Sequence, residues 1–143
     1  MPDFLLDTNV VVHQLRGEPR TVEFLDHIAA RGRLVCSVLS QTEVYAGMQA
    51  EEAVATGLFF KAVRLLTVTS RIAEAGGRLR REWYPSHGTG IIDGIIAASA
   101  LAHGIVLVTG NTRHFPMPAL ALVSPPAGRK PAKVVRGGAT LLD

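Results

Sequence analysis

The sequence predicts an α/β fold, a three-layer α/β/α sandwich around a short central parallel sheet. Short, continuously apolar segments alternate along the chain with longer segments in which apolar residues have helical spacing. Such continuous apolar runs are typical of parallel strands that helices cover on both faces. The length of 143 residues and the 48% content of hydrophobic residues fit one globular domain and exclude disordered and fibrous classes.

The first half of the chain is predicted to contain two strands and four helices. Their ranges are 3–6, 10–15, 21–30, 33–36, 40–48 and 51–65, of which 3–6 and 33–36 are the strands. A Gly-Glu-Pro segment ends the first helix, and the second carries Val22, Leu25 and Ile28 at helical spacing. The third helix begins with a capping signature at Ser40. The fourth is apolar on one side, although a glycine weakens it.

The second half is predicted to contain three strands and two helices. The strands are 66–68, 105–108 and 120–123, and the helices are 72–83 and 91–102. Gly76 and Gly77 weaken the first helix, whereas the second is apolar nearly all round, as a mostly buried helix should be. Gly104 ends that helix, and a fully apolar strand follows. In parallel sheets the reactive groups gather at the carboxyl ends of the strands, which is where we looked for a site.

The basic character of the chain belongs to its C-terminal segment. Residues 1–123 carry 11 Lys and Arg against 11 Asp and Glu, so this part is neutral, and residues 124–143 supply the net charge of +3. We therefore divide the chain into an α/β domain at 1–123 and a basic, Pro- and Gly-rich tail at 124–143. The tail is expected either to raise the affinity for nucleic acid through counterion release or to pack on its own domain or a partner.

Cysteine usage and hydropathy point to the cytoplasm and away from membranes. The single cysteine, Cys36, excludes an internal disulfide framework and fits a reducing compartment. Asp3 and Asp7 lie where a signal peptide would need a basic and then an apolar segment. The longest apolar stretch, 94–108, is interrupted by polar residues and reads as a buried helix and a strand.

Three carboxylates follow predicted strands or begin predicted helices. Asp7 follows the first strand, Glu43 lies one turn inside the helix after the second strand, and Asp93 lies near the start of the most buried helix. Thr109 and Asn111 come just past the last strong strand. If one edge of the sheet holds these groups together, the carboxylates repel one another unless a cation lies among them. Oxygen ligands without a His or Cys pattern favour Mg²⁺ or Mn²⁺, and such a site suits phosphodiester hydrolysis.

Each acid also has a structural interpretation that the sequence leaves open. Asp7 fits the N-cap of the helix that follows it, Ser40 and Glu43 match a capping box, and Asp93 suits the first turn of a helix. Caps do not explain why acids adjoin the most apolar stretches of the chain. For the three acids together we therefore favour the metal site.

Four sequence segments in this order and spacing resemble PIN-domain ribonucleases, and most of all the VapC-type toxins of bacterial toxin–antitoxin pairs. The segments are LLDTN at 5–9, SxxExxxG at 40–47, DGIIAASAL at 93–101 and LVTGNTRHF at 107–115. Any one of them alone is a weak signal. The resemblance covers residues 4–115, which is most of the chain.

The resemblance implies roles for individual residues. Asp7, Glu43 and Asp93 would be catalytic acids that bind Mg²⁺ or Mn²⁺, and Asn111 would be a weaker ligand. The supporting residues would be Thr8, Asn9, Ser40 and Thr109. The family often carries a fourth acid where this chain has Asn111, so the number of metal ions stays open. A water activated by the ion would hydrolyse RNA and leave 5′-phosphate and 3′-hydroxyl ends.

The resemblance also implies an RNA substrate, a homodimer and a cognate antitoxin that blocks the site. Arg78, Arg81 and Arg113 are candidates for RNA contacts, against the alternative of solvent-exposed positions. Arg80 belongs to the same basic cluster as Arg78 and Arg81 and has the same two interpretations. The sequence leaves two other functions open. One is a catalytically weak PIN-fold module that binds RNA or a partner. The other is a haloacid-dehalogenase-like phosphohydrolase, which would need an acid at the position of Asn9. The three intact acids favour a metal-dependent endoribonuclease toxin.

Overall fold

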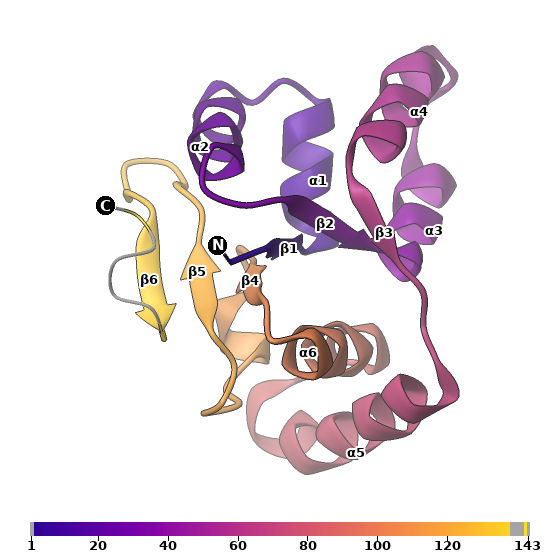
Figure 1. The fold of residues 1–143 in the computed structure, drawn as a ribbon, viewed down its shortest axis with the longest axis vertical. Coiled ribbons are helices and arrows are strands. Elements are labelled where there is room, and N and C mark those ends of the chain that lie inside the picture. Colours follow the sequence, from indigo (N-terminus) through magenta and orange to yellow (C-terminus); the bar gives the residue numbers. More distant parts are fainter. Residues whose placement is uncertain (1, 138–141, 143) are drawn as a thin grey trace.

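The computed structural model describes residues 2–137 and 142, and in it a six-stranded sheet lies between two layers of helices (Figure 1). The strands are β1 (Phe4–Leu6), β2 (Leu34–Ser37), β3 (Arg64–Leu66), β4 (Val106–Val108), β5 (Leu122–Ser124) and β6 (Lys133–Arg136). They lie in the order β3-β2-β1-β4-β5-β6, and all neighbours are parallel except β5 and β6. The predicted three-layer α/β/α class is therefore confirmed, with one antiparallel strand at the edge.

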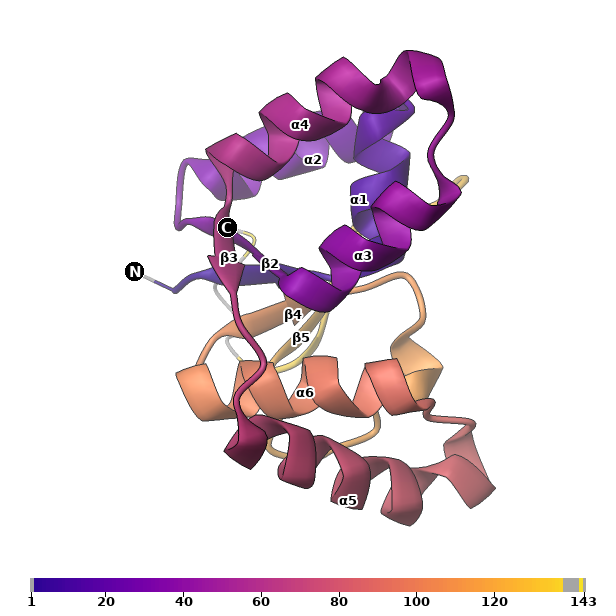
Figure 2. The ribbon, with the colours of Figure 1, turned by 90° about the vertical axis from the view of Figure 1, so that its right-hand side faces the viewer.

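The helices are divided between the two faces of the sheet. They are α1 (Thr8–Leu15), α2 (Pro19–Ala29), α3 (Val38–Gly47), α4 (Ala53–Ala62), α5 (Ser70–His87) and α6 (Ile91–His103), with short 3₁₀ turns η1 (Ala50–Glu52) and η2 (Thr112–His114). Figure 2 shows α1 to α4 on one face and α6 on the other, with α5 lying outside α6. In the part of the chain that the structure describes, no helix is long and apolar enough to cross a membrane.

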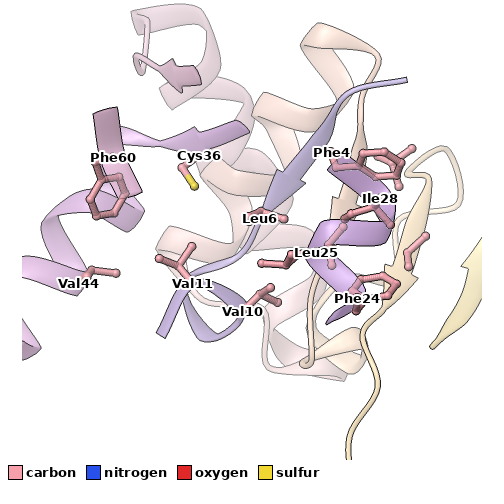
Figure 3. Packing of buried hydrophobic residues seen from close by; sticks show 13 residues of the cluster. Phe4, Leu6, Val10, Val11, Phe24, Leu25, Ile28, Cys36, Val44 and Phe60 are labelled. Carbon is pink, nitrogen blue, oxygen red and sulfur yellow. The ribbon is translucent and has the colours of Figure 1, made fainter. Parts of the chain in front are cut away.

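The central strands bury side chains on both faces. Phe4 and Leu6 of β1 belong to the core beneath α1 to α4, together with Val10 and Ile28 (Figure 3). Leu5, between them, belongs to the second core, beneath α6. This alternation explains why β1 is continuously apolar, because successive residues of a strand point to opposite faces and both faces are covered.

Two glycines allow α5 to lie close against α6. A Cβ on Gly94 would lie 2.3 Å from the carbonyl oxygen of Gly76, and a Cβ on Gly76 would lie 2.8 Å from Cα of Ile95. Both distances are too short for a side chain. Gly76, which was expected only to weaken its helix, is therefore needed for the packing of the two helices.

Several elements differ in extent from the sequence prediction, the third strand and α5 among them. The third strand is Arg64–Leu66 and not 66–68, because Arg64, Leu65 and Leu66 pair in register with β2 and α4 already ends at Ala62. Helix α5 continues to His87 with Pro85 in its last turn and ends where Gly88 adopts a φ of 70°. A left-handed residue after the last turn is a common helix end, and glycine adopts it without strain.

Helix α3 begins two residues earlier than predicted. Ser37 is its N-cap, with the Ser37 hydroxyl accepting a hydrogen bond from the Leu39 N–H at 3.1 Å. Ser40 consequently lies inside the helix and is buried. The capping box proposed for Ser40 and Glu43 is therefore wrong.

Part of the segment described as a tail belongs to the sheet. Residues 133–136 form β6, which pairs with β5, and Arg136 donates hydrogen bonds to the carbonyl oxygens of Phe115 and Leu120. These contacts agree with the alternative in which the segment packs on its own domain. Lys130 and Lys133 remain exposed. The boundary at residue 123 stays a prediction.

Candidate active site

A pocket of about 520 Å³ opens near the carboxyl ends of β1 and β4. All three acids singled out from the sequence line it. The lining residues are Asp7, Thr8, Asn9, Glu43, Arg80, Gly90, Ile91, Ile92, Asp93 and Asn111. The fold thus brings together residues from five separate stretches of the chain, as expected for the end of a parallel sheet.

Asp7 is the most buried acid of the pocket, with 5% of its surface exposed. It follows β1 directly and caps α1, accepting a hydrogen bond from the Thr8 N–H on Oδ1 at 2.9 Å. Its Oδ2 accepts from the Thr109 hydroxyl at 2.7 Å and from the Asn9 amide at 3.4 Å. The cap interpretation of Asp7 is confirmed, and the Thr109 hydroxyl adds a hydrogen bond from outside the helix.

The pKa of Asp7 is raised above its usual value. Burial is the largest cause, because it disfavours the charged carboxylate. The hydrogen bonds from Thr109 and Thr8 lower the pKa, and the negative charges of Asp93 and Glu43 raise it further. The other two carboxylates of the pocket therefore act on Asp7, although all three belong to different elements.

Glu43 lies on α3 and is exposed. Its Oε1 accepts a hydrogen bond from the Thr8 hydroxyl at 2.6 Å, and the Thr8 and Ser40 hydroxyl oxygens lie 2.9 Å apart. Ser40 and Glu43 are three residues apart and so share one face of the helix. Thr8 connects the two acids, because its N–H donates to Asp7 and its hydroxyl donates to Glu43.

Asp93 lies in the first turn of α6. Its Oδ2 accepts a hydrogen bond from the Gly90 N–H at 2.9 Å, and His114 Nδ1 lies 3.3 Å from the same oxygen. The structural interpretation of Asp93 as a residue that stabilises the helix start is therefore confirmed. The same side chain also lines the pocket, so the two roles are compatible.

The loop after β4 connects the supporting residues. The Gly110 N–H donates to Asn9 Oδ1 at 3.1 Å, and the Asn111 N–H donates to Thr109 Oγ1 at 3.0 Å. Thr109 is fully buried, whereas Asn111 is exposed at the pocket. Asn9 and Thr109 thus connect the loop to Asp7. Their role in orienting a metal site stays a prediction.

The side chains of the pocket fit a hard divalent cation. They offer carboxylate, amide and hydroxyl oxygens, and within the described ranges no Cys or His lines the pocket. A cation would also relieve the repulsion that Glu43 and Asp93 exert on Asp7. Among residues 2–137, no three acidic, His or Cys side chains already lie close enough together to hold an ion. Binding a metal here therefore requires a side-chain adjustment, for which the exposed Glu43 has room.

The arginines lie differently from what the sequence suggested. Arg80 of α5 lines the pocket. Arg78 is exposed and its Nη2 lies 2.6 Å from Glu74 Oε1, while Arg81 and Arg113 are exposed. RNA contacts of Arg78, Arg81 and Arg113 stay predictions. Arg80 is the member of the basic cluster Arg78, Arg80 and Arg81 that lies at the pocket, where it continues the buried stripe of Ile72 and Gly76 at intervals of four residues.

The chain has relatives among known proteins. A sequence model of the PIN domain family matches residues 4–119. Ribonuclease VapC19 from Mycobacterium tuberculosis is 41% identical over 115 residues, which are 79% of this chain and 92% of that protein. Ribonuclease VapC10 from the same species is 32% identical over 114 residues, 79% of this chain and 86% of that protein.

Solved structures with a similar fold include a VapBC complex and a toxin–antitoxin complex. DNA-bound VapBC from Salmonella typhimurium has a TM-score of 0.71 at 26% identity, covering 87% of this chain and 98% of that chain. A toxin–antitoxin complex from Klebsiella pneumoniae has a TM-score of 0.69 at 25% identity, covering 81% of this chain and 93% of that chain.

Proposed function

The chain belongs to the PIN domain family, and from this premise we propose that it is the endoribonuclease toxin of a toxin–antitoxin pair, with a metal site built on Asp7, Glu43 and Asp93. The observation that carries the proposal is the convergence of these three carboxylates on one pocket, within the residues that the family model matches. The PIN membership removes the haloacid-dehalogenase alternative.

The residues of the pocket have distinct parts in this proposal. A bound Mg²⁺ or Mn²⁺ lowers the pKa of water and stabilises negative charge on a phosphate. Asp7 offers a carboxylate whose orientation Thr109 and Thr8 fix, and Thr8 also orients Glu43. Asp93 is oriented by the hydrogen bond that it accepts from the Gly90 N–H at the start of α6. Asn111 contributes a neutral amide, and Asn9 and Ser40 support their neighbours.

The partners follow from the same premise. The solved neighbours are toxin–antitoxin complexes, and a cognate antitoxin is therefore the protein partner. The RNA substrate, the homodimer and the preference for Mg²⁺ or Mn²⁺ are part of the proposal, and RNA cleavage and an antitoxin imply the cytoplasm. Light scattering after size exclusion, with and without the antitoxin, measures the state of assembly.

The proposal is tested by cleavage of structured RNA. The purified protein should cut in Mg²⁺ or Mn²⁺, leave 5′-phosphate and 3′-hydroxyl ends, and stop in chelator. Asp93→Asn should stop cleavage, whereas Asp26→Asn, which removes an exposed acid of α2, should cut like wild type. Cleavage that continues undiminished in chelator would contradict the metal mechanism.

One observation favours a second candidate function, a catalytically weak module that binds RNA or a partner. Asn111 occupies the position at which the family often has an acid, and its side chain adds no charge to the pocket. If this substitution weakens the enzyme, Asn111→Asp should increase cleavage in Mg²⁺. A wild-type protein that binds RNA but does not cut it in any divalent ion would establish the binding function instead.

A further inference from the structure

Arg80 is the only Lys or Arg that lines the acidic pocket in the part of the chain that the structure describes. It lies on α5, in the outer helix of its layer, and is partly buried. A guanidinium beside three carboxylates would ordinarily be paired with one of them. Among the described residues, however, Arg80 makes no ion pair.

The contact that holds Arg80 is with an aromatic ring. The guanidinium carbon lies 4.0 Å from the centroid of the Tyr84 ring, one helical turn further along α5. Such a contact fixes the plane of the guanidinium without using any of its N–H donors. Within residues 2–137 the buried Nε of Arg80 has no hydrogen-bond partner. The cation is therefore positioned, but its hydrogen-bonding capacity is not used by the fold.

The position of Arg80 depends on the close packing of α5 on α6. A Cβ on Gly94 would lie 2.3 Å from the carbonyl oxygen of Gly76 and 3.3 Å from the backbone N of Arg80. The backbone of α5 at Arg80 is thus in contact with α6 one residue after Asp93. The close packing at Gly76 and Gly94 thus places Arg80 of α5 and Asp93 of α6 at the same pocket.

We infer that Arg80 forms a phosphate-binding subsite of the RNA-cleavage site, an inference that rests on the proposed function. The planar guanidinium can donate two parallel hydrogen bonds to phosphate oxygens, and these are among the strongest hydrogen bonds in proteins. The carboxylates repel an RNA phosphate, whereas Arg80 attracts it to the side of the pocket formed by α5. Arg80 then touches the substrate directly, and Tyr84 is the positioning residue that orients it.

The first experiment measures RNA binding without cleavage. A fluorescein-labelled single-stranded oligoribonucleotide of mixed sequence is titrated in chelator at several salt concentrations. Arg80→Gln should reduce the slope of log affinity against log salt by about 0.7, the value for one phosphate contact on a single strand. The matched control is Arg71→Gln, which removes an exposed cation of the same helix and should leave the slope near that of wild type. An unchanged slope in Arg80→Gln, or an equal loss in Arg71→Gln, overturns the inference.

The second experiment measures cleavage in Mg²⁺. Arg80→Gln should lower kcat by about 10²–10³-fold, the loss typical when one donor to developing negative charge is removed. Arg71→Gln should cut like wild type. If Arg80→Gln fails to fold in a thermal melt, Arg80→Lys takes its place, and it should keep the salt slope but lose at least about tenfold in kcat, because an ammonium cannot donate the paired hydrogen bonds.

The outcomes separate the inference from the proposed function. Wild-type protein that does not cut RNA contradicts the function, and the salt slopes still test Arg80. Wild-type protein that cuts in Mg²⁺, together with Arg80 variants that cut at the wild-type rate, leaves the function intact and overturns the inference.

Discussion

Asp7 and Glu43 line the same pocket but are held in opposite ways. Asp7 has 5% of its surface exposed and accepts hydrogen bonds from Thr109 and the Thr8 N–H. Glu43 is exposed on α3 and accepts one from the Thr8 hydroxyl. The difference follows from position, because Asp7 ends a buried central strand whereas Glu43 lies on the surface of a helix.

The two acids therefore differ in how firmly the fold positions them. Asp7 is positioned by the buried end of a sheet strand, whereas Glu43 lies on an exposed helix surface. Burial of a carboxylate is unfavourable unless hydrogen bonds or a cation compensate it, and the pKa of Asp7 reflects that cost. Glu43 keeps contact with water. Chemistry that needs a fixed ligand should therefore depend most on Asp7, whereas Glu43 should contribute mainly charge.

The largest expected effect is that of Asp7→Asn. The variant should lose at least about 10³-fold in cleavage rate in Mg²⁺, since a metal site contributes several kcal/mol to catalysis. Its metal-free form should melt at a higher temperature than wild type at neutral pH, because a buried charge and its repulsion from Asp93 and Glu43 are removed. Cleavage at the wild-type rate would contradict the role of Asp7.

The raised pKa of Asp7 also predicts that the stability of the metal-free protein depends on pH. Its raised pKa means that the folded protein binds this proton more tightly than the unfolded chain. The metal-free protein should therefore lose stability as pH rises from the usual carboxyl pKa through the raised one. Because other acids titrate as well, the test is the difference between wild type and Asp7→Asn in denaturant unfolding. That difference should grow with pH in favour of the variant, and a constant difference would contradict the assignment.

A smaller loss of cleavage rate is expected for Glu43→Gln. The variant should lose about 10–100-fold in cleavage rate, as for groups that support a metal site, because Gln keeps an oxygen ligand but no charge. Its metal-free stability should increase less than that of Asp7→Asn, since water already screens the exposed Glu43. An equal or larger increase in the melting temperature would show that the contrast between the two acids is wrong.

The threonines that donate hydrogen bonds to the two acids should show the same difference between the buried Asp7 and the exposed Glu43, as smaller changes in the free energy of unfolding. Thr109→Val removes a buried hydrogen bond to Asp7 and should cost about 1–3 kcal/mol of unfolding free energy. Thr8→Val removes the exposed hydrogen bond to Glu43 and the contact with Ser40, and should cost less than Thr109→Val, about 1 kcal/mol. Urea unfolding of both variants without metal measures the difference, and equal losses would mean that burial does not separate the two sides.

The smallest effect on chemistry is expected outside the pocket, at Lys130 and Lys133. These exposed cations line a groove that Gly110 and Thr112, the neighbours of Asn111, also line. Changing both to Gln should flatten the salt dependence of RNA binding by about 1.4, for two phosphate contacts, and leave kcat unchanged. Lys61→Gln with Arg71→Gln is the control of equal charge. A slope equal to that of wild type would favour a purely structural segment.

The sequence was sufficient to predict the order of most elements and the general position of the acids, because apolar runs mark buried strands whatever their partners. The sequence was ambiguous where two local conformations suit the same residues equally well. Ser40 and Ser37 can each cap a helix, and in the structure Ser37 is the N-cap of α3. The shift of the third strand to Arg64 reflects pairing with β2, which no local pattern records.

Long-range contacts decide what could not be predicted at the site, such as which arginine of the basic cluster lies at the pocket. Arg80 joins the pocket through the close packing of Gly76 and Gly94, so its role depends on residues of two helices at once. The attachment of Arg136 to Phe115 and Leu120 likewise has no local signal. Asp7, in contrast, was predicted as an N-cap and Asp93 as a first-turn residue, and both as members of one site. In the structure Asp7 caps α1, Asp93 lies in the first turn of α6, and both line the pocket.

The central claim, that the three carboxylates form one divalent-metal site, is tested most directly by the unfolding free energy as a function of Mg²⁺ concentration. Wild type should gain about 2.7 kcal/mol at a hundredfold excess over the dissociation constant. Asp7→Asn and Asp93→Asn should lose this gain, Glu43→Gln should lose most of it, and Asp26→Asn should retain it. A wild-type protein without any response to Mg²⁺ or Mn²⁺, or a Glu43→Gln variant that responds like wild type, would contradict the claim.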